Sequence, residues 1–239
     1  MTRRRWIADR IAGGRAYLTG QNAAHLARVL RAKPGQQFDI AAEGVVRTGT
    51  IISITAEQVE FELGEPVQSS PLPEISVVLA IFKFDRMEWA IEKLTELGVA
   101  TVLPVISRRT EPHLAKAAEK RVERWRKIAR EAAQQARRLT PPEIASPASL
   151  KKAIQEAGGC RIVLSEMEET VSLKSALSQC RPPLALAFGP EGGWIADELD
   201  MFRDNRWTSA SLGNTILRSE TAVIAAVAVA MVALSAPPR

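Results

Sequence analysis

The sequence is poor in the residues that build metal centres and disulfide frameworks. Its 239 residues include only 2 cysteines and 2 histidines. Cys160 and Cys180 are too few for a disulfide framework or a four-ligand zinc site, and His25 and His113 supply little for a histidine-based metal centre. We therefore expect no bound metal, and we expect a cytosolic protein in which both thiols are reduced.

A hydrophobic run long enough for a membrane span is also missing. The one long apolar run, Thr221–Ala236, has 16 residues, whereas a transmembrane helix needs about 20. No apolar stretch follows the basic residues Met1–Arg5, so we expect no signal peptide. Hydrophobic residues make up 46% of the chain and charged residues 25%, which is typical of a folded protein with a core. The apolar run predicts a buried helix, and we expect no membrane partner.

Positive charge is concentrated near the N-terminus. Residues 1–36 contain eight Lys or Arg against one acid, a net charge of +7, whereas residues 37–67 have one Arg against six acids, a net charge of −5. Clustered positive charge is typical of proteins that bind nucleic-acid phosphates, although it can also be a solvated surface. We favour nucleic-acid binding for this segment, and a solvated helix face for the second basic stretch, residues 119–138. The candidate RNA-binding residues are Arg3, Arg4, Arg5, Arg10, His25, Arg28 and Arg31.

The first part of the chain has the periodicity of short strands. Strands are predicted at 16–19, 37–41, 45–54 and 58–63, with one helix at 22–30 that Asn22 would cap. This pattern predicts a small β-barrel, because closure removes exposed strand edges. The polar, proline-rich stretch 68–73 is interpreted as a domain boundary, which gives domains at residues 1–68 and 73–239.

The second part of the chain alternates strands with helices. Strands are predicted at 75–81, 99–106, 161–165, 184–188 and 208–212, and helices at 87–97, 115–138, 197–205 and 220–234. Such alternation predicts an α/β fold with a parallel sheet.

Two glycine-bearing loops each follow a predicted strand. The first is Phe188–Trp194 (FGPEGGW) and the second is Ser211–Thr221 (SLGNTILRSET). Ligands bind at the carboxyl ends of the strands in α/β sheets, so the loops predict one bipartite pocket, with two unrelated tight turns as the alternative. Neither loop has the pattern G-x-G-x-x-G or a P-loop lysine, which argues against a nucleotide phosphate. Their backbone amides and apolar side chains suit a flat neutral ring.

Nucleophilic catalysis has no support in the sequence, because no G-x-S-x-G motif occurs and neither cysteine has a neighbouring histidine. Arg218 projects from the second loop. It could act on a substrate or only pair with Glu220 or Glu191, and the sequence leaves both roles open. His25 is interpreted as a surface or RNA-facing residue and not as a catalytic base.

The motifs resemble those of the SPOUT methyltransferases, and more closely those of the bacterial 16S ribosomal RNA uracil-N3 methyltransferase family (RsmE). The glycine loops, Gly189–Gly193 and Ser211–Ala222, carry most of the resemblance. Further matching segments lie at 25–31, 83–89, 92–98 and 123–133, so the resemblance covers nearly the whole chain in the right order.

The resemblance implies a PUA-like RNA-binding barrel, followed by a SPOUT domain with a deep trefoil knot. It also implies a homodimer with the C-terminal helix at the interface. The cofactor would be S-adenosylmethionine, and the substrate would be N3 of a specific uridine near the 3′ end of 16S RNA in the small ribosomal subunit. The implied cofactor-binding residues are Phe188, Gly189, Pro190, Glu191, Gly192, Gly193, Leu212, Gly213, Asn214, Ile216 and Leu217.

Methylation at N3 requires that the uracil lose a proton. We expect Arg218 to stabilise the negative charge that develops on the uracil oxygens, with Glu220 as a second candidate, in the role of proton acceptor. Two other functions stay open: a SPOUT methyltransferase acting on transfer RNA or another ribosomal base, and a non-catalytic RNA-binding factor in ribosome assembly.

The chain departs from the family pattern in two places. Many relatives read Glu-Gln-Ser-Gly-Arg where this chain has Gln134–Arg138 (QQARR), so Ala136 and Arg137 replace a small polar pair, and a substrate contact there is in doubt. After Trp194 the family often has a Ser or Thr helix cap, whereas this chain has Ile195, which leaves Asp197 as an imperfect substitute.

Overall fold

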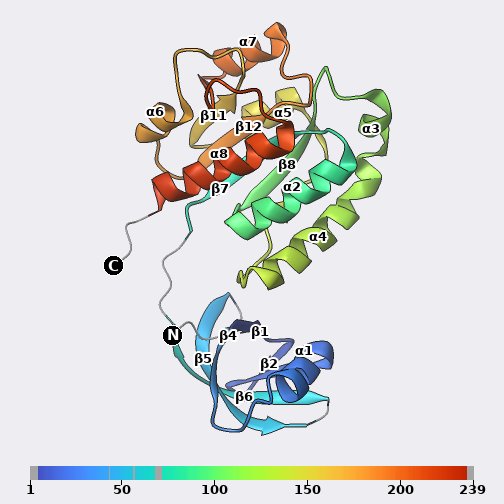
Figure 1. The fold of residues 1–239 in the computed structure, drawn as a ribbon, viewed down its shortest axis with the longest axis vertical. Coiled ribbons are helices and arrows are strands. Elements are labelled where there is room, and N and C mark those ends of the chain that lie inside the picture. The colour runs from blue at the N-terminus through green and yellow to red at the C-terminus, as the bar shows by residue number, and fades with distance from the viewer. Residues whose placement is uncertain (1–4, 43, 56, 68–71, 236–239) are drawn as a thin grey trace. The chain divides into compact units, whose positions relative to one another are not determined.

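The fold consists of two compact units, each with its own β-sheet (Figure 1). The computed structural model describes residues 5–42, 44–55, 57–67 and 72–235. The first unit comprises Met1–Ser70 with Arg137–Thr140, and the second comprises Pro71–Ala136 with Pro141–Arg239.

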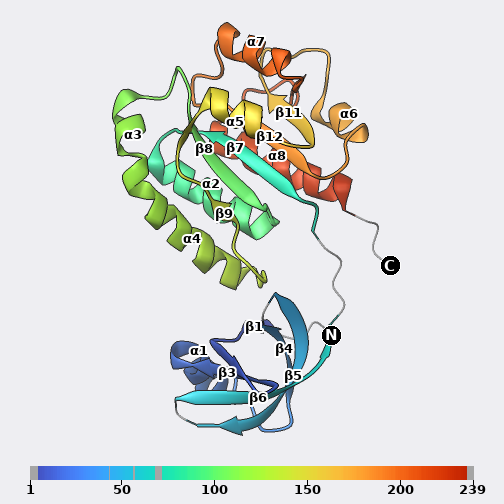
Figure 2. The ribbon, with the colours of Figure 1, turned by 180° about the vertical axis from the view of Figure 1, so that it is seen from behind.

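The first unit is a curled six-stranded sheet with one helical segment (Figure 2). Its strands are β1 (Arg5–Ile7), β2 (Arg10–Ala12), β3 (Arg15–Thr19), β4 (Gln37–Ala42), β5 (Val45–Ile54) and β6 (Gln58–Pro66), and its helical turns are α1 (Gly20–Ala24) and the π-helical η1 (His25–Val29). The strand order is β1-β4-β5-β6-β3-β2. Strands β1 and β2 are the two ends of this order. Within the described residues no hydrogen bonds pair β1 with β2, so the sheet is a half-barrel and not a closed barrel.

The helical segment differs from the sequence prediction at its start and along its length. Thr19 precedes α1 in an extended conformation and its side chain makes no capping hydrogen bond, so the predicted cap at Asn22 is wrong. From His25 the helix widens into η1 and does not continue as one α-helix. Leu26 on η1 is fully buried in the apolar core of the unit, together with Leu18 and Phe61 from the sheet, which anchors the segment to the sheet.

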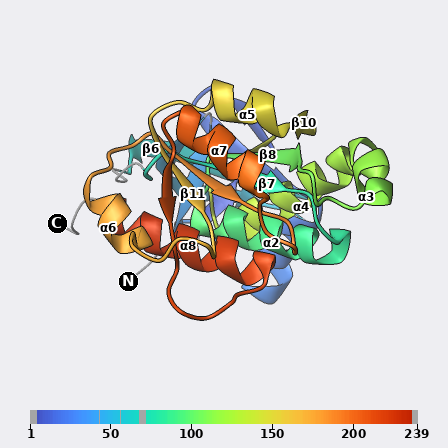
Figure 3. The same cartoon turned by 90° about the horizontal axis from the view of Figure 1, so that it is seen from above.

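The second unit has a parallel sheet between two layers of helices (Figure 3). Its strands are β7 (Ile75–Ala80), β8 (Thr101–Ile106), β9 (Glu143–Ile144), β10 (Ala148–Ser149), β11 (Cys160–Leu164), β12 (Leu184–Phe188) and β13 (Thr208–Ala210). The helices are α2 (Phe84–Leu97), α3 (Pro112–Ala117), the 3-10 turn η2 (Glu119–Arg121), α4 (Val122–Gln135), α5 (Leu150–Glu156), α6 (Leu173–Ser178), α7 (Ala196–Asp204) and α8 (Ser219–Leu234). The strand order is β10-β8-β7-β12-β11-β13, with β9 paired to β8, and all pairs are parallel. This arrangement confirms the predicted α/β class; the deep knot stays a prediction.

Successive residues of β7 face opposite helical layers. Val77 and Leu79 belong to the core that includes residues of α2, α4, α6 and α8, whereas Val78 and Ala80 belong to the core that includes α5 and α7. Burial on both faces explains why the strand is a continuous apolar run in the sequence. The single helix predicted at 115–138 is wrong, because the chain there forms α3, η2 and α4 in succession.

Cys160, at the start of β11, and Cys180, after α6, are joined by a disulfide. The expectation of two reduced thiols is therefore wrong in this structure. The two Cα atoms lie 5.6 Å apart, a separation that a disulfide can bridge, although 20 positions separate the residues in the sequence. Among the residues that the structure describes, no helix is both long enough and apolar enough to cross a bilayer.

Candidate functional site

Three loops meet at one edge of the parallel sheet. Strand β11 lies between β12 and β13, and all three run in the same direction, so their carboxyl ends share an edge. The loops that leave them, 165–169, 189–194 and 211–218, surround a cavity of about 510 Å³. The prediction that the two glycine loops form one pocket is confirmed in its geometry.

Ten of the eleven predicted cofactor-binding residues line this cavity. They are Phe188, Gly189, Pro190, Glu191, Gly193, Leu212, Gly213, Asn214, Ile216 and Leu217. Gly192 does not line it; its carbonyl instead accepts a hydrogen bond from the guanidinium of Arg109. That contact fixes the first loop to the segment that follows β8.

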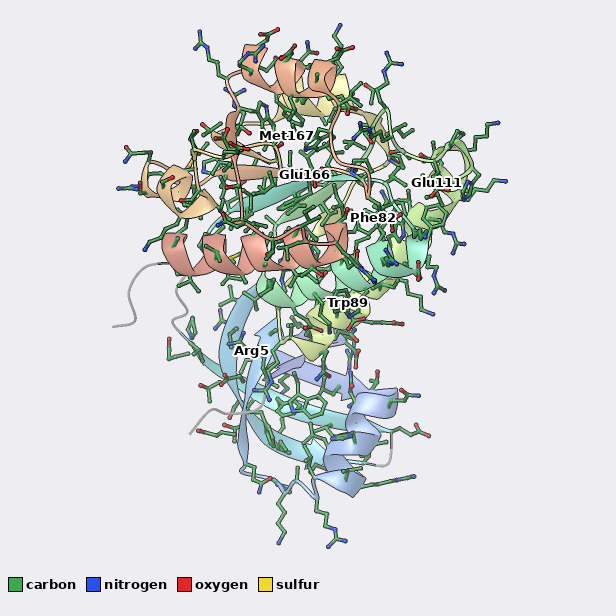
Figure 4. All side chains as sticks on the ribbon, turned by 45° about the horizontal axis from the view of Figure 1, so that its top comes forward. Arg5, Phe82, Trp89, Glu111, Glu166 and Met167 are labelled. Carbon is green, nitrogen blue, oxygen red and sulfur yellow. A yellow bond between two sulfur atoms is a disulfide. The ribbon has the colours of Figure 1, made fainter. Side chains whose placement is uncertain are left out.

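The sequence pattern did not reveal the third loop. Figure 4 shows Glu166 and Met167, which follow β11 after Ser165 and line the cavity. The sequence predicts a strand at 161–165, and the carboxyl end of that strand is itself a place where a ligand could bind. The loop after it contains no glycine, however, and so it did not stand out as a ligand-binding segment.

Two glycines of the cavity adopt backbone conformations that other residues rarely take. Gly193 has φ +70° and Gly213 has φ +124°. A Cβ atom on Gly193 would lie 2.9 Å from a carboxylate oxygen of Glu166, which is closer than packed atoms approach. The Gly193 amide also donates to the carbonyl of Pro190 over 2.8 Å. Glycine is thus favoured at position 193 by its left-handed backbone conformation, and a larger residue would in addition displace the flexible carboxylate of Glu166.

A buried carboxylate fastens the end of the first loop. Glu198 accepts hydrogen bonds from the backbone amides of Ile195 (3.1 Å) and Arg108 (2.8 Å). It therefore satisfies an orphan amide at the start of α7 and ties α7 to the segment after β8. The expectation that Asp197 replaces the missing Ser or Thr cap is wrong, because among the described residues the side chain that bonds the backbone at the start of α7 is that of Glu198, which accepts from the amide of Ile195. Next to it, the indole of Trp194 donates to the carbonyl of Leu164 (3.1 Å) and joins the first loop to β11.

Arg86, on the first turn of α2, forms the ion pairs that the sequence left open for Arg218. Its Nη1 lies 2.6 Å from Oε1 of Glu191, and its Nε lies 3.6 Å from Oε1 of Glu220. Arg218 is exposed at the start of α8, and its side chain has no hydrogen bond or ion pair with any described residue. Leu217 and Ser219 on either side of it both line the cavity. Glu220 is buried and does not line the cavity.

Glu168 organises the third loop from within. Its carboxylate accepts hydrogen bonds from the hydroxyl of Thr170 (2.6 Å) and from the amides of Thr170 (2.9 Å) and Val171 (2.9 Å). These bonds, the Thr170 hydroxyl first among them, hold the pKa of Glu168 below its usual range, because they stabilise the ionised form.

The charged side chains that line the cavity are all acidic. The lining contains four glutamates, Glu166, Glu168, Glu169 and Glu191, and no lysine or arginine among its described residues. Carboxylates favour a cationic ligand and oppose a phosphate. The apolar side chains of Phe188, Leu212, Ile216 and Leu217 add surface for a flat ring.

The predicted RNA-binding residues are spread over the first unit. His25 and Arg28 are exposed on η1, and Arg31 follows them, also exposed, with a left-handed φ of +48°. The ring of His25 lies 5.8 Å from that of Trp6 on β1. The structure thus brings His25 and Arg28 together on one turn.

The remaining basic candidates lie elsewhere or make internal contacts. The guanidinium of Arg10 on β2 stacks over the ring of Tyr17 at 3.9 Å and is exposed. Arg5 donates from Nη1 to the carbonyl of Arg137 (3.0 Å). Arg3 and Arg4 lie outside the described residues.

Comparison with known proteins gives one consistent family. Residues 68–231 match the RNA methyltransferase domain, and residues 18–64 match the RNA methyltransferase PUA domain. The chain is 30% identical to Ribosomal RNA small subunit methyltransferase E of Bacillus subtilis over 217 residues, which cover 86% of this chain and 85% of that protein. It is 31% identical to the protein of the same name from Mycobacterium bovis, over 90% of this chain and 85% of that one.

A solved structure agrees with both units. Ribosomal RNA small subunit methyltransferase E from Neisseria gonorrhoeae, bound to S-adenosyl methionine, superposes with a TM-score of 0.75 at 25% identity, and the match covers 98% of each chain. The sequence resemblance and the PUA-like character of the half-barrel are confirmed. This chain therefore belongs to the ribosomal RNA small subunit methyltransferase E family.

Proposed function

We propose that this protein transfers a methyl group from S-adenosylmethionine to N3 of a uridine in 16S ribosomal RNA of the small subunit. One observation carries the proposal: two glycine loops and an acidic third loop enclose a single cavity, and Arg218, which has no partner among the described residues, stands beside it. The relatives named above support the ribosomal substrate, and the relative from Neisseria gonorrhoeae supports the cofactor.

The cavity fits this cofactor in size, charge and shape. Its volume of about 510 Å³ is that of a small-molecule site. S-Adenosylmethionine supplies a methyl group activated by a positively charged sulfur, and the one-sided acidic lining suits a cation of this kind. Backbone groups of the glycine loops and the apolar side chains would hold its purine, while Glu166 and Glu191 would lie near its charged end.

The protein's own residues must deal with the proton and the charge on uracil. N3 carries a proton and is a poor nucleophile until that proton is lost. A negative charge then spreads over N3 and the two ring oxygens. Arg218 would stabilise this charge, because its positively charged guanidinium has no carboxylate partner among the described residues. Glu220 is the second candidate, as proton acceptor, although its burial beside Arg86 weighs against that role.

The two units would have different functions. We propose that residues 1–68 bind RNA and that residues 73–239 hold the cofactor and perform the transfer. Exposed His25, Arg28 and Arg31 would contact phosphates and fix the position of the RNA without reading its sequence. The target base would have to leave its stack to reach the cavity.

We also propose that two copies of the chain associate through α8. The helix is apolar all round, a pattern typical of a helix that is buried on every side. One side packs in the core through Val223, Val227 and Met231, yet Val229 and Val232 on the other side are exposed. A second copy would cover them. Val232→Glu should convert a dimer into a monomer in light scattering; a wild-type protein that is already monomeric contradicts the dimer.

The function is tested with purified protein and labelled S-adenosylmethionine. We expect label in small ribosomal subunits or 16S RNA, recovered as 3-methyluridine, and none in transfer RNA. Label in transfer RNA or on another base would favour a different methyltransferase activity. Cofactor binding without any transfer, or no binding at all, would favour the RNA-binding assembly factor.

A further inference from the structure

We infer that Arg86 is a positioning residue that fastens the two halves of the cofactor cavity to each other. The inference rests on the proposed function, because it assumes that the cavity holds S-adenosylmethionine. Independently of any cofactor, the Arg86 guanidinium on α2 would hold the first glycine loop at a fixed position relative to the start of α8.

The geometry joins three segments that are distant in the sequence. Glu191 lies in the first loop and lines the cavity, and Glu220 lies in the first turn of α8, directly after the second loop. Arg86 hydrogen-bonds to Glu191 over 2.6 Å and reaches Glu220 at 3.6 Å. The Arg86 side chain is 29% exposed, and that of Glu191 is 32% exposed, so this pair is partly shielded from water and salt.

The two ends of the contact have different consequences. Glu220 is buried, and its Oε2 atom has no hydrogen-bond partner among the described residues, so Arg86 supplies the positive charge that compensates it. Loss of that charge would leave a buried carboxylate unpaired and would lower stability. Glu191 belongs to a loop, so loss of its ion pair with Arg86 would instead make the wall of the cavity more mobile.

The contact also keeps Arg218 free. Both carboxylates that could have paired with Arg218 are bound by Arg86, so the exposed guanidinium stays available to a substrate. Arg86 therefore acts on the reaction through other residues and need not touch the cofactor or the uracil.

The test compares Arg86→Gln, Glu191→Gln, Arg86→Lys and the double variant Arg86→Gln/Glu220→Gln with the wild type. Each protein is measured for melting temperature, for hydrogen exchange in peptides that cover residues 189–194, and for S-adenosylmethionine affinity by calorimetry. Arg203→Gln is the matched control, because Arg203 makes one exposed ion pair, 2.7 Å from Asp200 on α7.

We expect Arg86→Gln to lower the melting temperature, to accelerate exchange at 189–194 about tenfold and to weaken cofactor binding about tenfold. The double variant should recover the melting temperature, because it has no buried Glu220 carboxylate without a positive partner. It should keep the fast exchange and the weak cofactor binding, because Glu191 still lacks Arg86. Glu191→Gln should show the fast exchange and weak binding without the loss in melting temperature. Arg86→Lys should recover part of the affinity, and the Arg203→Gln control should match the wild type in all three measurements.

Two results would overturn the inference. One is wild-type exchange at 189–194 in Arg86→Gln and Glu191→Gln. The other is full recovery of affinity in the double variant, which would reduce Arg86 to a partner of Glu220. If the wild type itself fails to bind S-adenosylmethionine, the proposed function is wrong, and the exchange data still decide whether Arg86 fastens the loop.

Discussion

The Arg86 guanidinium lies 2.6 Å from the carboxylate of Glu191, although 105 positions separate them in the sequence. This ion pair shows which arginine pairs with Glu191, one of the four glutamates that line the cavity. It also leaves Arg218 as an exposed cation beside the cavity with no carboxylate partner in the described part of the chain.

Replacement of Arg218 by Ala should remove turnover and spare cofactor binding. Loss of one group that stabilises developing charge costs about 10²–10³ in kcat, so we expect a fall of at least about 100-fold in methyl transfer. The dissociation constant for S-adenosylmethionine should change less than about threefold, since Arg218 does not line the cavity. Single-turnover kinetics and calorimetry measure the two effects. Parallel loss of cofactor binding would assign Arg218 to the cavity wall.

Gly193→Ala should damage the cavity, whereas Gly158→Ala should not. An alanine at 193 would need φ +70°, which is strained for an L-residue, and its Cβ would displace the carboxylate of Glu166 from the cavity wall, so the loop is strained and the lining altered. We expect cofactor affinity to fall at least about tenfold, the equivalent of about 1.4 kcal/mol. Gly158 is a matched control, because a Cβ atom added there would meet no other atom within 4 Å. Equal affinities in the two variants would contradict this role of Gly193.

Arg137→Gly should stabilise the protein. Arg137 has φ +56°, a left-handed conformation that costs an L-residue about 1 kcal/mol and that glycine adopts freely. The family pattern has glycine at this place, so the departure carries a conformational cost. We expect the free energy of unfolding to rise by about 0.5–1 kcal/mol in urea titrations. An unchanged or lower value would contradict a conformational cost at Arg137 that exceeds the extra unfolded-chain entropy of glycine.

Glu168→Gln should lower stability near neutral pH and have less effect in acid. The pKa of Glu168 is depressed in the folded state, so its ionised form contributes stability above the unfolded pKa, and this contribution is lost as the pH falls through the folded pKa. The difference between wild type and variant should stay under about 1 kcal/mol at pH 7, because the carboxylate is partly exposed, and should shrink below about pH 4.5. Urea titrations at pH 7 and pH 3 measure it. A difference that grows in acid would contradict the assigned sign.

Elements buried on both faces were predictable from the sequence. The strand at 184–188 matches β12 at both ends, because every residue of this strand is buried and its apolar run is unbroken. The glycine loops were predictable for a related reason: glycines after a buried strand mark a place where the backbone needs unusual conformations or close approach.

Features that depend on contacts between distant segments were not predictable. Nothing near Arg86 in the sequence indicates that it meets Glu191 and Glu220, and nothing near Cys160 indicates its pairing with Cys180. Strands β1 and β2 have three residues each, too few for an alternating pattern to appear. The loop at 165–169 contains no glycine to mark it as a ligand-binding segment, and it enters the site because β11 lies between β12 and β13.

The most direct measurement maps modified nucleosides in 16S RNA from cells that lack this gene, after complementation with the wild type or with Arg218→Ala. We predict one 3-methyluridine, near the 3′ end of the RNA, that is present with the wild type and absent with the variant. A 16S RNA whose 3-methyluridine content is the same with and without the gene would contradict it.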